Sequence, residues 1–217
     1  MTATLLLARH GQTVWHAENR YAGISDVALT PEGRAQAGRL AGWAVWQPHR
    51  PDAVWTSTVP RAIETAAPVC AALGLTPHRE HDLRECDFGT VEGRTLAEFA
   101  AECPEAAAAF TRDPAAHPFP GAEDPRAAAA RGAAALARIA AAHDGGRVLV
   151  VAHNTLFRLV LCALLGIPLG EYRRVFPALR NAAVTELRLA PGRGAAPPRA
   201  ALLALNVPVE PPAGTDG

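Results

Sequence analysis

The chain has 217 residues, and 49% of them are hydrophobic, which is enough for one domain with a substantial core. Its 21 basic and 21 acidic residues cancel, so the charge gives no reason to expect a nucleic-acid partner or a membrane surface. All 21 basic residues are arginine. The absence of lysine excludes P-loop nucleotide-binding enzymes, Schiff-base enzymes and pyridoxal-phosphate enzymes, each of which depends on a lysine side chain.

Serine and cysteine usage narrows the chemistry further. The two serines, Ser25 and Ser57, lie outside any G-x-S-x-G motif, which excludes a serine hydrolase with that nucleophile turn. The cysteines form no C-x-x-C pair and no metal-ligand spacing; they are Cys70, Cys86, Cys103 and Cys162. The chain has no apolar run of membrane-spanning length, and the first expected strand begins almost at Met1, which argues against a signal peptide. We therefore predict a cytoplasmic protein with reduced thiols.

The first chemical signal is Arg9-His10-Gly11, which follows the apolar run 5–8 and predicts a buried strand that ends in a tight loop. The planar guanidinium of Arg9 suits a phosphate or a carboxylate. An imidazole beside such a cation tends to stay neutral, which is its nucleophilic form. Our hypothesis is that His10 attacks phosphorus. An isolated tripeptide of this kind is more often a capping histidine with a surface arginine, so the hypothesis depends on the rest of the chain.

The next elements alternate between helix and strand. Residues 15–23 are polar and aromatic without periodicity and predict a loop, after which Thr30 and Pro31 mark a helix start. A short strand is expected over 52–56, and Ser57-Thr58 are expected to cap a second helix. Arg61 falls in the first turn of that helix, where free backbone N–H groups favour an anion. The alternative for Arg61 is an exposed helix arginine.

The middle of the chain predicts a short strand over 75–80 and an inserted cap over about 86–122. The segment 90–120 is rich in Ala, Glu and Pro and contains one plausible helix, 96–103. His78, His81 and Asp82 have a spacing that metal ligands sometimes show. We regard a metal site as the weaker interpretation, because residues 78 and 81 of a strand would face opposite sides.

The C-terminal half repeats the opening pattern, because a buried strand over 147–152 ends at His153 between helices expected over 126–143 and 156–165. Closing strands are expected over 184–189 and 200–206, around a loop over 191–198. We predict one domain over 1–207 and a disordered tail over 208–217. The fold class is α/β, a three-layer αβα sandwich with a mostly parallel central sheet. Ligands of such folds bind at the carboxyl ends of the strands, where Arg9, His10, Arg61 and His153 would meet.

The chain resembles the histidine phosphatase superfamily, in its phosphoglycerate-mutase-like branch, from Leu5 to about Leu189. Five motifs in the expected order carry the resemblance, and five in register are far more specific than one. They are Arg9-His10-Gly11-Gln12-Thr13, Leu29-Thr30-Pro31-x-Gly33, Ser57-x-x-x-Arg61-Ala62-x-Glu64-Thr65, Leu83-x-Glu85-x-x-Phe88-Gly89 with Glu92-Gly93, and Val150-Val151-Ala152-His153.

The resemblance implies that His10 becomes phosphohistidine, and that Glu85 protonates the leaving oxygen and then activates water. It also implies that Arg9, Arg61 and His153 bind the phosphate, with no metal or other cofactor. Two positions depart from the family pattern: His16 stands where asparagine is usual, and Asn154 stands where glycine is common. We include both as candidate phosphate-binding residues.

The expected function is that of a metal-independent phosphomonoesterase for a small phosphorylated metabolite, such as a sugar phosphate or a phosphoglycerate-like compound. One alternative is a phosphoglycerate-mutase-type phosphoryl transfer, and a second is a catalytically silent binding protein of the same fold. Only Arg94 and Arg112 are basic within 90–120, which disfavours a lid for a bisphosphorylated species. Neither a nucleic acid nor a membrane is expected as a partner.

Overall fold

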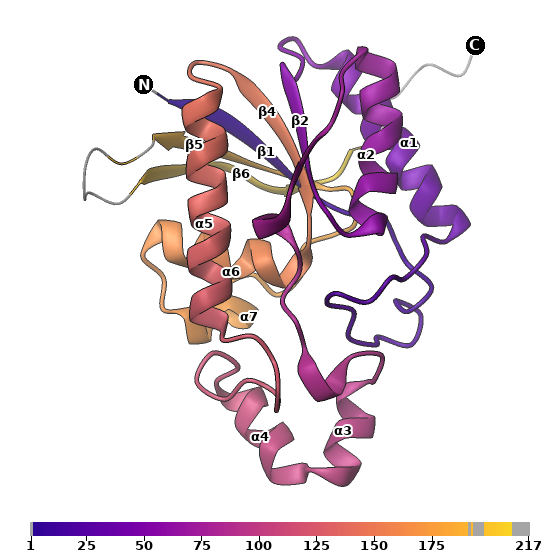
Figure 1. The fold of residues 1–217 in the computed structure, drawn as a ribbon, viewed down its shortest axis with the longest axis vertical. Coiled ribbons are helices and arrows are strands. Elements are labelled where there is room, and N and C mark those ends of the chain that lie inside the picture. The colour runs from indigo at the N-terminus through magenta and orange to yellow at the C-terminus, as the bar shows by residue number, and fades with distance from the viewer. Residues whose placement is uncertain (1, 191, 193–197, 210–217) are drawn as a thin grey trace.

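The computed structural model describes residues 2–190, 192 and 198–209 and contains one sheet of six strands in the order β3-β2-β4-β1-β5-β6 (Figure 1). The strands are β1 (Ala3–Arg9), β2 (Ala53–Ser57), β3 (His78–Glu80), β4 (Arg147–Ala152), β5 (Val184–Ala190) and β6 (Arg199–Val207). Strands β3, β2, β4 and β1 pair in parallel, and β5 pairs antiparallel with both β1 and β6. Because β5 alone runs in the opposite direction among these strands, the prediction of a mostly parallel sheet is confirmed.

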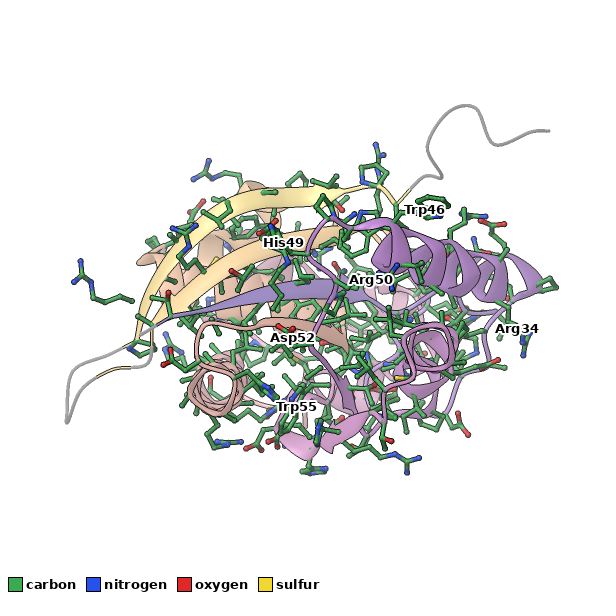
Figure 2. All side chains as sticks on the ribbon, turned by 90° about the horizontal axis from the view of Figure 1, so that it is seen from above. Arg34, Trp46, His49, Arg50, Asp52 and Trp55 are labelled. Carbon is green, nitrogen blue, oxygen red and sulfur yellow. The ribbon has the colours of Figure 1, made fainter. Side chains whose placement is uncertain are left out.

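Helices cover both faces of the sheet and confirm the αβα architecture. The principal helices are α1 (Pro31–Trp46), α2 (Pro60–Leu73), α5 (Pro125–Ala142) and α6 (Asn154–Leu165). Figure 2 shows α1 and α2 on one side of the sheet and α5 on the other, from the end at which Asp52 lies. Leu5 and Leu7 pack with the α5–α6 side, whereas Leu6 and Ala8 pack with the α1–α2 side. A strand buried on both faces needs a continuous apolar run, which explains the sequence of β1.

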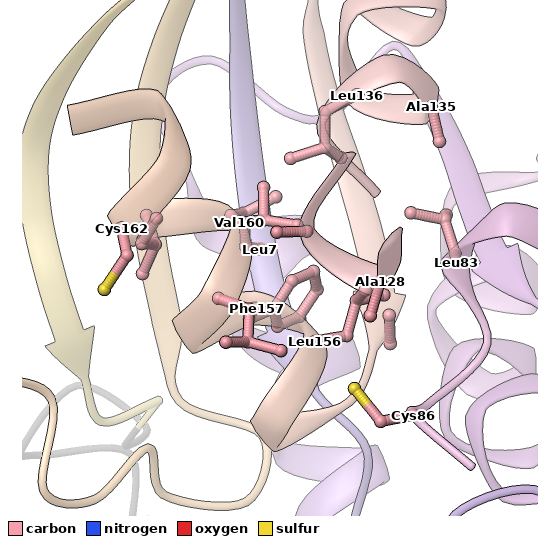
Figure 3. Close-up of a cluster of buried hydrophobic side chains, with 14 of the residues drawn as sticks. Leu7, Leu83, Cys86, Ala128, Ala135, Leu136, Leu156, Phe157, Val160 and Cys162 are labelled. Atoms are coloured by element: carbon pink, nitrogen blue, oxygen red, sulfur yellow. The ribbon is translucent and has the colours of Figure 1, made fainter. Parts of the chain in front are cut away.

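The core between α5 and α6 depends on small residues in α5 (Figure 3). Leu156, Phe157 and Val160 of α6 are fully or almost fully buried there with Leu7. A Cβ atom on Gly132 would lie 2.5 Å from Cγ2 of Val160 and 2.8 Å from Cδ1 of Leu156. The two helices therefore approach closely at Gly132, and this packing holds the first turn of α6 at the carboxyl end of β4.

The predicted start of α1 is correct, whereas the predicted start of α2 is wrong. The side chain of Thr30 accepts a hydrogen bond from the backbone N–H of Gly33 (3.0 Å), and Pro31 is the first residue of α1, as predicted. The second helix, in contrast, begins at Pro60 with Val59 as its N-cap residue. Ser57 accepts a hydrogen bond from the Val59 N–H (3.2 Å), but it lies at the end of β2 and does not cap α2. The proline, with φ already set for a helix, determines where α2 starts.

The segment predicted to hold one helix holds two, α3 (Leu96–Glu102) and α4 (Pro104–Arg112), which we call the cap. The cap lies apart from the sheet at the bottom of Figure 1. Pro104 ends one helix and begins the next, and this restart was missed. The aromatic rings of Phe110 and Phe119 stack at 3.9 Å between centroids, and Phe99 packs edge-on against Phe119 at 5.2 Å. These contacts give the cap an apolar centre of its own.

Three short 3₁₀ turns and a four-residue helix were not predicted. The helix is α7 (Tyr172–Val175), and the turns are His81–Leu83, Gly89–Val91 and Leu169–Glu171. Of the tail predicted to be disordered from residue 208, Val209 is instead buried against the α1–α2 side of the sheet. Most of the expected loop over 191–198, and residues 210–217, lie outside the described residues. No helix in the described part of the chain is long and apolar enough to cross a membrane.

Candidate active site

The predicted site residues surround a cavity of about 430 Å³ at the carboxyl ends of β1 and β4, a volume that suits a small metabolite. We call it the His10 cavity. Its lining includes Arg9, His10, His16, Glu85 and Asn154, which all came from the sequence analysis. Arg61 and His153 do not line it but lie directly behind His10, at 1% and 0% exposure. The structure thus brings all seven residues to one place.

His10 is held with Nδ1 as a hydrogen-bond donor and Nε2 as an acceptor. Its Nδ1 donates a hydrogen bond to the carbonyl oxygen of Gly11 (2.8 Å), so in the neutral ring Nε2 carries the lone pair. Burial, and then the charges of Arg61, His153 and Arg9, hold the pKa of His10 well below its usual value. Gly11 permits this geometry, because a Cβ atom there would lie 2.4 Å from the carbonyl oxygen of Gly33. His10 is therefore a neutral imidazole with a directed nucleophilic nitrogen.

Arg61 fixes the orientation of that nitrogen. Its Nε donates to Nε2 of His10 (3.1 Å), and its Nη2 lies 3.4 Å from Nδ1 of His153. The rest of its guanidinium donates to three carbonyl oxygens of the first loop, those of Ala22 (2.9 Å), Gly23 (2.6 Å) and Ser25 (2.9 Å). A buried cation held by neutral carbonyls keeps a strong positive potential beside the nucleophile.

Arg9 and His16 meet at the cavity wall. Nη1 of Arg9 donates to the carbonyl oxygen of Leu179 (2.8 Å), and Nη2 lies 2.5 Å from Nε2 of His16. Because a guanidinium only donates, Nε2 of His16 is the acceptor of this hydrogen bond, and the proton of the neutral ring lies on Nδ1, 2.8 Å from the Thr13 hydroxyl oxygen. Burial, and then Arg9, lower the pKa of His16 to about 4, so the ring is neutral at pH 7. His16 thereby holds Nη2 of Arg9 at the cavity wall.

Glu85 is seated on the first turn of α6. Its Oε1 accepts hydrogen bonds from the backbone N–H groups of Cys86 (3.0 Å) and Leu156 (2.8 Å), and Oε2 accepts from that of Thr155 (2.9 Å). The carboxyl group is thereby fixed across the cavity mouth, although 70 residues separate Glu85 from Thr155. Oε2, with a single backbone contact, has the more open lone pair.

Asn154 is the first residue of α6, and its Oδ1 is buried without a hydrogen-bond partner among the described residues. A buried orphan acceptor beside a cavity is the kind of group that a ligand satisfies. Asn154 does not cap α6 with its side chain, because His153 is the N-cap residue and makes no side-chain cap.

The cavity also contains two arginines that the sequence analysis missed, Arg158 of α6 and Arg173 of α7. Arg158 is only 5% exposed, and its signal in the sequence is a single charge within an otherwise apolar helix. Arg173 lies in a helix too short to predict, and no local pattern distinguishes it.

The weaker metal interpretation gains no support from the geometry. His78 stacks on the indole ring of Trp55 at 4.8 Å between centroids. Trp55 in turn donates its ring N–H to Nε2 of His143 (3.0 Å). Within residues 2–190, 192 and 198–209, no three His, Cys, Asp or Glu side chains come together as a metal-binding group.

The family model of the histidine phosphatase superfamily (branch 1) matches residues 5–197. The chain belongs to this superfamily. It is 34% identical over 182 residues to bifunctional protein Rv2228c of Mycobacterium tuberculosis, and the match covers 84% of this chain and 50% of that protein. The chain thus spans about half the length of the first curated relatives that it matches.

Two further histidine phosphatase relatives are similar over most of their length. Phosphoserine phosphatase 1 of Hydrogenobacter thermophilus is 29% identical over 168 residues, which cover 77% of this chain and 79% of that protein. The structure of the mycobacterial glucosyl-3-phosphoglycerate phosphatase Rv2419c superposes with a TM-score of 0.83 at 28% identity, covering 95% of this chain and 100% of that one. The expected fold and family are confirmed.

Proposed function

We propose that this chain is a metal-independent phosphomonoesterase that hydrolyses a small phosphorylated metabolite through a phosphohistidine at His10. The observation that carries the proposal is the fixed tautomer of His10, which lines the cavity with Nε2 as an acceptor beside Arg9 and the buried Arg61. The two phosphatase relatives described above support a small phosphorylated metabolite as the substrate.

In the first step, Nε2 of His10 gives up its hydrogen bond from Nε of Arg61 and attacks phosphorus, and the bond to the ester oxygen breaks. The leaving alkoxide takes a proton from the Glu85 carboxyl group, for which Oε2 has the more accessible position. The phosphoryl oxygens lie against Arg9, and Arg61 adds its positive charge from behind the ring. The positive charge that develops on the imidazole is spread by the Nδ1–H contact to the Gly11 carbonyl.

In the second step, the Glu85 carboxylate takes a proton from water. The water oxygen attacks phosphorus, the P–N bond breaks, and Nε2 of His10 regains its lone pair. The product is inorganic phosphate, and Glu85 ends the cycle protonated as it began. No metal is required in this scheme, because fixed guanidinium groups supply the charge that a cation would bring to the equatorial oxygens.

In this proposal His16 takes the place of the asparagine that is usual in the family and positions Arg9. Nε2 of His16 accepts from Nη2 of Arg9 (2.5 Å), and a phosphoryl oxygen would replace that nitrogen as the acceptor. The unpaired Oδ1 of Asn154 is available to a hydroxyl group of the substrate.

The cap favours hydrolysis over phosphoryl return to the product. No residue of α3 or α4 lines the His10 cavity, so water reaches the phosphohistidine without displacing a lid. Of the two arginines within 90–120, Arg94 is already paired with Glu102 (2.6 Å). A mutase must retain its product and exclude water, and the described cap supplies neither function.

Product analysis tests the proposal. We expect phosphate release from 3-phosphoglycerate, phosphoserine or a sugar phosphate, with negligible isomer even when a trace of 2,3-bisphosphoglycerate is present. Brief exposure to labelled substrate should give an acid-labile, base-stable phosphoryl group on the wild type and none on His10→Ala, with a rate loss of at least about a thousandfold. Isomerisation faster than phosphate release would establish the mutase instead, and labelling of His10→Ala would refute the covalent step.

A further inference from the structure

The His10 cavity holds more positive charge than one phosphate group requires. Four arginines in or directly behind it form no ion pair among the described residues: Arg9, Arg61, Arg158 and Arg173. Arg20, which also lines the cavity, is neutralised by Glu18 (2.7 Å) and Glu98 (2.8 Å). In a chain whose charges balance overall, this local surplus lies at the one place where an anionic substrate is expected.

Arg158 is buried, yet one arm of its guanidinium is open to the cavity. Its Nε donates to the carbonyl oxygen of Phe176 (2.5 Å) and its Nη2 to that of Pro177 (2.8 Å). Its Cζ lies 5.4 Å from the centre of the Tyr172 ring. Within the described residues Nη1 has no hydrogen-bond partner, and the side chain lines the cavity. A cation this well held, with one donor group unused, is preorganised for a ligand.

Arg173 lies next to Arg158 and is likewise presented by aromatic groups. Its Cζ lies 5.4 Å from the centre of the Phe110 ring, and its Nη1 donates weakly to the Tyr21 hydroxyl (3.4 Å). Both side chains line the His10 cavity, and Arg158 packs against the ring of Tyr172, the residue directly before Arg173. Both side chains come from the α6–α7 side of the molecule (Figure 1).

The loop after α7 sets the spacing between this pair and the phosphate site. The carbonyl oxygen of Pro177 holds Arg158, and that of Leu179, two residues further on, holds Arg9. Two residues of extended chain span at most about 7 Å. Arg9 and Arg158 are therefore held from points that a three-carbon compound with an anionic group at each end can bridge.

We propose that Arg158 and Arg173 form a second anion site, which takes the carboxylate of a small phosphorylated carboxylic acid while its phosphate lies against Arg9 and His10. The inference rests on the proposed phosphatase function. The four guanidinium groups carry four positive charges when Glu85 is protonated, as the first step of the proposed reaction requires. A phosphate dianion and one carboxylate neutralise three of these charges, whereas an uncharged sugar would leave the buried Arg158 without an anionic partner.

Matched substrates separate this inference from the proposed function. 3-Phosphoglycerate and racemic glycerol 3-phosphate share a carbon skeleton, but the first has a carboxylate where the second has a hydroxymethyl group. Phosphoserine and phosphoethanolamine form a second pair, in which only phosphoserine has the carboxylate. In at least one pair we expect the wild type to prefer the carboxylate by about 10- to 100-fold in kcat/KM. Arg173→Gln should lose most of that preference through a higher KM, and should change the rate with the partner lacking the carboxylate by less than about threefold.

Arg174→Gln is the control, because Arg174 lies on the same helix, does not line the cavity and is paired with Glu171. Arg174→Gln should leave kcat/KM for both members of a pair unchanged, and Arg173→Lys should retain part of the carboxylate preference that Arg173→Gln loses. Equal losses for both members of a pair in Arg173→Gln would show that Arg173 only supports the cap, and would overturn the second anion site. Equal wild-type rates within both pairs would overturn it as well while leaving the phosphatase intact. Failure to release phosphate from any of these compounds or from p-nitrophenyl phosphate would refute the proposed function itself.

Discussion

Replacement of Glu85 by glutamine tests the proton-transfer role and its structural setting together. Oε1 of Glu85 accepts two backbone N–H groups and Oε2 accepts one. The amide nitrogen of glutamine would therefore take the position of Oε2, where it meets only the Thr155 N–H. One hydrogen bond is lost and two donors face each other, which costs about 1–3 kcal/mol. For a chain of 217 residues this corresponds to a fall in Tm of roughly 2–12 °C.

The catalytic loss should depend on the leaving group. An alkyl phosphate needs a proton on its leaving oxygen, so its phosphoryl transfer to His10 should slow by about 10²–10⁴-fold in Glu85→Gln. p-Nitrophenolate leaves without a proton, so the same step should remain fast with p-nitrophenyl phosphate. Hydrolysis of the phosphohistidine still needs a base, and its slowing should produce a burst of about one nitrophenolate per enzyme molecule.

Rapid-quench and stopped-flow measurements with the two substrates give both rates, and Glu102→Gln controls for loss of an exposed carboxylate. If Glu85→Gln slows phosphoryl transfer from both substrates by the same factor, Glu85 is not the proton donor. If the burst is absent while steady-state turnover falls, Glu85 does not act as the base for water. Either result would refute a proton-transfer role that we inferred from the hydrogen bonds between Glu85 and the first turn of α6.

Arg61→Lys should retain charge but lose the contacts to three loop carbonyls, and we expect a loss of about 2–4 kcal/mol in transition-state stabilisation, seen mainly in kcat; wild-type kinetics would contradict this. Chelators should leave activity unchanged, and restoration of a chelated enzyme by a divalent ion would refute a metal-free mechanism. Burial lowers the pKa values of His10 and His153, so only the unfolded state gains their protons below about pH 6.5. The free energy of unfolding should therefore decrease as the pH is lowered, by about 3 kcal/mol between pH 7.5 and pH 5.5 in denaturant titrations. An equal free energy of unfolding at both pH values would contradict the buried, neutral state of these rings.

Local signals in the sequence were sufficient for most of the elements. The run 5–8 is apolar at every position because β1 is covered on both faces, and Thr30-Pro31 specifies a helix start within one turn of chain. Such signals act over a few residues. They failed where competing starts lie close together: Pro60 displaced the expected cap at Ser57, and Pro104 split one expected helix into two.

The motif residues of the candidate site were also readable from the sequence, because Arg9, His10 and His153 each follow directly from a buried strand of one sheet. Parallel pairing of β1 with β4 places Arg9 opposite Ala152, so that His10 and His153 must be neighbours. Their protonation states were only partly predictable. The sequence indicated a neutral His10, but its tautomer depends on the Gly11 carbonyl, and that of His16 on Arg9 and the Thr13 hydroxyl.

The sequence alone thus determined the architecture and indicated the residues for which we propose the roles of nucleophile and proton donor. Tertiary structure alone decided the extent of the site, since Arg158 and Arg173 reach the cavity from α6 and α7, and only packing and the carbonyls of the loop after α7 orient them. Helices α3 and α4 contribute no residue to the described lining of the cavity, and of the segment predicted as the cap, 86–122, only Phe88 lines it. The physical reason is that strand ends and helix caps follow from local chemistry, whereas the contacts of a long, flexible arginine depend on elements distant in the chain.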